Sequence, residues 1–117
     1  MSSGSGDITF TGAVGGATNG EFGALIANTT GVTLFSSTVE AASLTSNAGG
    51  TTRLNGNVTT SGTQTYNDAV QFDDAITLAT TNSAVLFAST TNSQGSEANA
   101  LTAVSYTHLT LPTILLV

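Results

Sequence analysis

The chain has 117 residues, of which only 7% are charged, and its single basic residue among Lys and Arg faces seven acids for a formal net charge of −6. Without a basic patch it lacks the electrostatic footprint of a nucleic-acid-binding protein, and it is equally unsuited to an anionic membrane surface. The absence of cysteine excludes disulfides and thiolate metal sites, and no apolar run approaches the ~20 residues of a membrane-spanning helix.

The remaining composition favours an ordered all-β protein. Hydrophobic residues make up 39% of the chain, whereas disordered chains usually combine low hydrophobicity with high charge. Most of the other residues are Thr, Ser, Asn and Gly. Thr and Val favour strands, and Gly and Asn favour turns.

Short segments in which apolar and polar residues alternate follow one another along most of the chain. After a flexible start over residues 1–6, we expect strands at 8–14, 25–27, 32–35, 39–44, 51–58, 63–70, 75–79, 85–88 and 100–104. Breaks such as Gly15-Gly16 and Ser61-Gly62 separate most of them. No stretch carries a helical period, so the sequence predicts strands and turns only.

A pattern of one apolar residue, three small or polar residues and a second apolar residue recurs at 10–14, 35–39, 54–58 and 72–76, and weakly at 87–91. The first members are Phe10, Phe35, Leu54, Phe72 and Phe87, and the second members are Val14, Val39, Val58, Ile76 and Thr91. The steps between first members are 25, 19, 18 and 15 residues, which is the size of one unit in a stacked array.

In a parallel β-helix, equivalent inward residues of successive coils lie above one another. The first members of the pattern would then form one apolar column and the second members the next. The sequence predicts an all-β, parallel β-helix (solenoid) of about 4–5 coils over residues 7–103. A β-sandwich, which also consists of many short strands, is the alternative.

The composition changes after Ala103, where the only His and the only Pro of the chain follow as His108 and Pro112. Residues 104–113 are the translation, without a mismatch, of GTC TCT TAT ACA CAT CTG ACG CTG CCG ACG. Residues 104–117 therefore resemble translated sequencing-adapter sequence of the transposase type, in which a short index, GTG and a stop codon follow. We expect 104–117 to be a non-native tail and 7–103 to be part of a longer protein.

Carboxylates are the main candidates for chemistry. Ser-His-Asp and Ser-Lys arrangements are unavailable because Lys is absent and His108 lies in the tail. Asp68, Asp73 and Asp74 are weak calcium candidates, since calcium prefers oxygen ligands, and a pair of them is the minimum for glycoside hydrolysis. No calcium-loop motif accompanies them. We therefore expect a solvated acidic edge, no catalytic residue, no cofactor and no metal site.

Three other side-chain types have expected places. The four phenylalanines that begin copies of the pattern should stack in the core. Tyr66 should also lie in the core with its hydroxyl hydrogen-bonded, because it occupies an apolar position of its strand. Arg53 should face outward and pair with a nearby acid, as a surface ion pair.

Residues 6–14 (GDITFTGAV), 42–52 (ASLTSNAGGTT) and 57–70 (NVTTSGTQTYNDAV) carry a resemblance to a known group. Together, residues 6–103 resemble the repeats of filamentous haemagglutinin-like and autotransporter-passenger-like bacterial exoproteins. The resemblance implies a right-handed parallel β-helix, an extracellular or cell-surface location, and a non-catalytic role as spacer or adhesion scaffold. The implied partners are the rest of a longer chain and host-cell or biofilm surface ligands.

Two other functions stay open from the sequence. One is a carbohydrate- or calcium-binding adhesin repeat with a β-sandwich fold. The other is a polysaccharide-active enzyme on a β-helix, with Asp68 or Asp73 as the acid.

Overall fold

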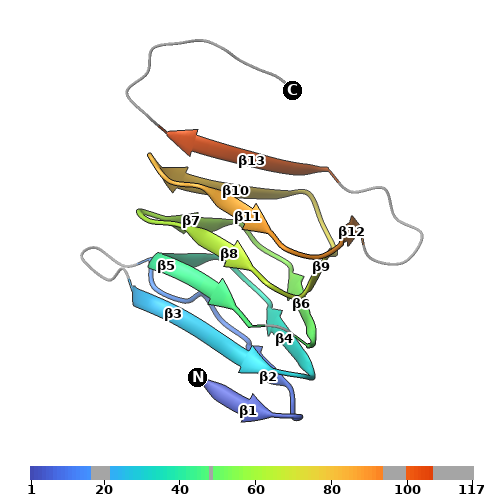
Figure 1. Ribbon diagram of the computed structural model, residues 1–117. Coiled ribbons are helices and arrows are strands. Elements are labelled where there is room, and N and C mark those ends of the chain that lie inside the picture. Colours follow the sequence, from blue (N-terminus) through green and yellow to red (C-terminus); the bar gives the residue numbers. More distant parts are fainter. Residues whose placement is uncertain (17–21, 48, 94–99, 107–117) are drawn as a thin grey trace.

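The computed structural model describes residues 1–16, 22–47, 49–93 and 100–106, which form two parallel sheets and no helix (Figure 1). The five-stranded sheet consists of β2 (Ile8–Phe10), β4 (Val32–Phe35), β6 (Thr51–Leu54), β9 (Ala69–Phe72) and β12 (Thr91–Ser93). The eight-stranded sheet consists of β1 (Ser2–Gly4), β3 (Phe22–Thr29), β5 (Val39–Ser46), β7 (Val58–Thr60), β8 (Gln64–Tyr66), β10 (Ile76–Thr81), β11 (Val85–Phe87) and β13 (Leu101–Tyr106).

Each coil passes through three faces in turn. The five-stranded face is the sheet of that name. The β7 face contains Val14, the first half of β5, β7, β10 and β13. The β8 face contains β1, β3, the second half of β5, β8 and β11. The chain therefore winds as a β-solenoid of about four turns, which confirms the predicted parallel β-helix.

Every strand pair in the two sheets is parallel. A β-sandwich consists of antiparallel sheets joined by hairpins and Greek-key connections. The sandwich alternative is therefore wrong for this chain. The cause is the 18- to 25-residue spacing of the repeated pattern, which places each segment beside its equivalent in the next turn.

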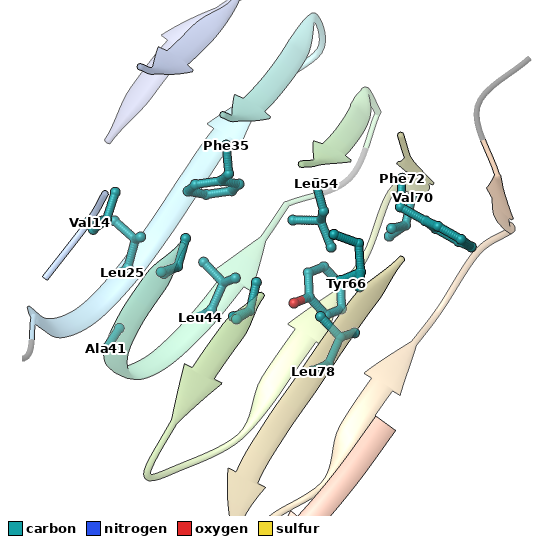
Figure 2. Close-up of a cluster of buried hydrophobic side chains, with 13 residues drawn as sticks. Val14, Leu25, Phe35, Ala41, Leu44, Leu54, Tyr66, Val70, Phe72 and Leu78 are labelled. Carbon is teal, nitrogen blue, oxygen red and sulfur yellow. The ribbon is translucent and has the colours of Figure 1, made fainter. Parts of the chain in front are cut away.

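The register confirms the first predicted column. Phe10 lies beside Phe35, Phe35 beside Leu54, and Leu54 beside Phe72. The rings of Phe10 and Phe35 stack with centroids 4.9 Å apart and planes 1° from parallel. Figure 2 shows Phe35, Leu54 and Phe72 in one row of the interior. Leu54 is fully buried between its two neighbours.

The weak fifth copy of the pattern is misplaced by the sequence. Ser93, and not Phe87, lies beside Phe72. Phe87 lies on the β8 face instead, where its ring stacks on that of Tyr66 with centroids 5.3 Å apart. The step of 15 residues is shorter than one turn at this point, so residue 87 has not yet returned to the five-stranded face.

The second predicted column is confirmed over three coils. Val14 bridges to Val39, and Val39 lies beside Val58. In the next coil Leu78 takes the position beside Val58 that the pattern assigned to Ile76. Two extra residues in the corner after β9 produce this shift, and Ile76 is buried one step earlier on the same strand.

Two expected strands are interrupted by corners. The segment 51–58 divides into β6 and β7, and the segment 63–70 divides into β8 and β9. Strand β5 instead turns its corner without a break, and the alternation of buried and exposed side chains slips at Ala42-Ser43. The side-chain alternation of a straight strand is therefore preserved only within each face.

The two ends of the predicted repeat region also differ from expectation. Residues 2–4 form β1 rather than a flexible start, because the amides of Asn28 and Thr30 donate to the carbonyls of Met1 and Gly4 at 2.9 and 2.8 Å. Strand β13 crosses the expected boundary after Ala103 and continues beside β10 to Tyr106. Most of the expected tail, 107–117, lies outside the described residues.

The corner between the β8 face and the five-stranded face requires glycine. A Cβ atom on Gly50 would lie 2.1 Å from the carbonyl oxygen of Gly31 in the coil below. Gly49 has a φ of 108°, a conformation that residues with a side chain rarely adopt. Successive coils thus approach each other here without room for a methyl group.

Candidate functional site

The three candidate carboxylates lie at two different corners of the solenoid. Asp68 lies between β8 and β9, and Asp73 and Asp74 follow β9. The four residues of β9 separate the two corners, and each rises by about 3.3 Å along the strand. The structure therefore does not bring Asp68 to the other two carboxylates.

Asp68 is buried, with 4% of its surface exposed. The hydroxyl of Ser46 donates to its Oδ1 at 2.7 Å. The hydroxyl of Thr52 donates to Oδ1 and Oδ2 at 2.9 and 3.1 Å. Both hydroxyls belong to the coil below. The expectation of a solvated acidic edge is wrong for Asp68, because its side chain turns inward and connects two coils.

Asp73 forms the ion pair expected for Arg53. The Nη2 of Arg53 lies 2.7 Å from the Oδ2 of Asp73, and the two side chains are 32% and 22% exposed. Pairs at this level of exposure contribute about 0–1 kcal/mol. The expectation that Arg53 faces outward and pairs with an acid is confirmed, and Asp73 is committed to that contact.

Asp74 is exposed and caps its own corner. Its Oδ1 accepts a hydrogen bond from the amide of Ala75 at 2.8 Å. This local contact is typical of aspartate in turns. None of the three carboxylates points to a shared ligand.

Among the described residues, no group of three or more His, Asp or Glu side chains is placed to hold a metal ion, and no cavity or cleft is found. Calcium requires six to eight oxygen ligands around one point. Glycoside hydrolysis requires two carboxylates on opposite sides of a sugar. The arrangement of Asp68, Asp73 and Asp74 provides neither geometry.

The interior contains a polar pair that the sequence did not reveal. Gln64 is fully buried in a column that contains Leu25 and Leu44. Its Nε2 donates to the carbonyl of Ala79 at 2.9 Å, and at 3.3 Å to the carbonyl of Val58 and the hydroxyl of Thr60. A glutamine between apolar positions of an alternating strand was the available signal.

Tyr66 completes this network. It is fully buried, and its hydroxyl donates to the Oε1 of Gln64 at 2.8 Å. Burial raises the pKa of Tyr66 far above its usual value. The expectation of a core tyrosine with a hydrogen-bonded hydroxyl is confirmed. Figure 2 shows its ring between Leu54 and Leu78, so the pair stabilises the interior and faces no ligand.

No family model, curated protein or solved structure matches this chain. The described part of the chain also has no helix of the length and apolarity that crossing a membrane requires. The arguments about function therefore depend on the solenoid and its surfaces.

Proposed function

We propose that this chain is a non-catalytic structural segment of a large secreted bacterial surface protein, in which it acts as a spacer or adhesion scaffold. The observation that carries this proposal is the continuity of the columns. Phe10, Phe35, Leu54 and Phe72 follow one another from coil to coil, and every coil contacts only its neighbours. Such a stack gains length with each added coil and keeps its cross-section.

The placement of the acidic side chains supports the same proposal. Asp68 connects coils through Ser46 and Thr52, and Asp73 pairs with Arg53. In both places the carboxylate stabilises the stack rather than presenting itself to a substrate. The resemblance of residues 6–103 to exoprotein repeats suggests the location, which is the cell surface or the exterior as part of a longer chain.

A coil duplication tests the mechanical part of the proposal. Because Val39 lies beside Val58, a second copy of residues 39–57 adds one turn in register. We expect the duplicated chain to fold, to melt at the same temperature or higher, and to be longer along the coil axis by about 4.8 Å in small-angle X-ray scattering. Insertion of the same residues in scrambled order is the matched control, and it should destabilise the chain.

A duplication that destabilises the chain as strongly as the scrambled insertion would contradict the spacer proposal. The secreted, multi-coil part is tested by the sequence of the surrounding locus. We expect further units of about 19 residues in the same reading frame and an N-terminal secretion signal. A flanking reading frame without such units would contradict it.

A further inference from the structure

The outer surface of the β8 face carries no charged side chain over four coils. Its residues alternate with buried ones along β3, β5, β8 and β11 and in the corners beside them. In Figure 1 these strands form the side nearest the viewer. The outward residues are Ala24, Ile26, Asn28, Ser43, Thr45, Asn47, Thr63, Thr65, Asn67, Ala84, Leu86 and Ala88.

The central column of this face has a symmetric order. Ile26 lies beside Thr45, Thr45 beside Thr65, and Thr65 beside Leu86. Ile26 and Leu86 are 47% and 52% exposed, although both are large and apolar. The column therefore reads apolar, hydroxyl, hydroxyl, apolar from either end.

The neighbouring column repeats this order with smaller side chains. Ala24 lies beside Ser43, and Thr63 follows in the next coil, where its carbonyl accepts from the amide of Leu44 at 3.2 Å. Ala84 comes next, with its carbonyl 3.1 Å from the amide of Gln64. A surface with this order is self-complementary, because a two-fold axis places each apolar row on an apolar row and each hydroxyl row on a hydroxyl row.

The distribution of charge points to the same partner. The chain has a formal net charge of −6, so most contacts between two copies would bring acids together. The described charged side chains lie on the other faces, at the corners or, for Asp68, in the interior. At one end of the β8 face the amino group of Met1 donates to the carbonyl of Ile26 at 2.6 Å. Two copies therefore meet through this face without opposing acids.

We propose that the β8 face binds a second copy of this chain, face to face about a two-fold axis, with Ile26, Thr45, Thr65 and Leu86 at the centre. Four rungs at ~4.8 Å and five residues at ~3.3 Å give an area of about 300 Å² per copy. Stable complexes bury about 800 Å² per partner. The pairing is accordingly weak and depends on concentration, and additional coils strengthen it by enlarging the face.

Thiol crosslinking of the full chain tests this contact, because the sequence contains no other cysteine. We expect a short bis-maleimide to produce covalent dimers of the Ile26→Cys variant alone if the coil axes run in the same direction. If they run in opposite directions, dimers form when Ile26→Cys and Leu86→Cys are mixed. Thr59→Cys is the control, since Thr59 is exposed on the β7 face. Absence of dimers in both arms, or equal yield from Thr59→Cys, overturns the proposal.

A charge substitution provides an independent readout. Adding Thr45→Glu to the thiol variants should lower the dimer yield about tenfold or more, because it opposes like charges at the centre. Thr45→Asn, which adds no charge, should keep the yield. Thr9→Glu on the five-stranded face is the matched control. If Thr9→Glu lowers the yield as much as Thr45→Glu, the association does not use the β8 face and the proposal is wrong.

Discussion

The hydrogen bond between Tyr66 and Gln64 predicts a measurable coupling between two buried side chains. The hydroxyl of Tyr66 lies 2.8 Å from the Oε1 of Gln64, and both residues are fully buried. Tyr66→Phe leaves the Gln64 oxygen without its donor. Gln64→Leu leaves the Tyr66 hydroxyl without its acceptor. A buried polar group that loses its partner costs about 1–3 kcal/mol.

The double variant should lose less stability than the two single variants together. Leucine fits a column that already contains Leu44, and phenylalanine keeps the ring that stacks on Phe87. Only the donors to the carbonyls of Ala79 and Val58 then remain missing. We expect a coupling of about 1–2 kcal/mol in the free energy of unfolding.

Equilibrium urea unfolding followed by circular dichroism measures this coupling for the four proteins of the cycle. Thr65→Val, which changes the outward side chain between the two residues, is the control and should shift the free energy by about 0.5 kcal/mol or less. If the effects of the single variants add to within about 0.5 kcal/mol, the two side chains are not in contact and the interior is described incorrectly.

Three further predictions concern the corners and the interior. Gly50→Ala should cost about 2 kcal/mol or more, because the new methyl group would lie 2.1 Å from a carbonyl oxygen; Gly23→Ala, which meets nothing within 4 Å, should be nearly neutral in thermal unfolding. Asp68→Ala should cost about 1–3 kcal/mol by leaving two buried hydroxyls without an acceptor, whereas Asp74→Ala should cost under about 1 kcal/mol; equal effects in urea unfolding would refute the buried position. Because burial raises the pKa of Tyr66, its contribution is complete below about pH 10 and falls by about 1.4 kcal/mol per pH unit above that as the unfolded chain ionises. Unfolding at pH 9–12 should show this slope in the parent chain and a smaller one in Tyr66→Phe.

The spacing of apolar residues was sufficient to predict the solenoid and its main columns. Phe10, Phe35, Leu54 and Phe72 occupy equivalent positions because the turns between them keep a nearly constant length, and the parallel register follows from that. The prediction failed where a turn changed length. The shorter step to Phe87 moved this ring to another face, beside Tyr66.

The roles of the polar residues were harder to predict. Sequence alternation does not say whether a corner residue turns inward, and Asp68 does so because two hydroxyls of the coil below, Ser46 and Thr52, replace its water. Gln64 likewise lies in the core because the Val58 and Ala79 carbonyls and the Tyr66 hydroxyl satisfy its amide group. These partners come from different coils, so only the three-dimensional stack identifies them.

The register between neighbouring coils is the central claim, and nuclear Overhauser effects between backbone protons of adjacent strands measure it directly. We predict contacts of the parallel type between Thr45 and Thr65 on the β8 face and between Leu34 and Arg53 on the five-stranded face. Cross-strand contacts of the antiparallel type between residues 39–46 and 58–66 would contradict the solenoid.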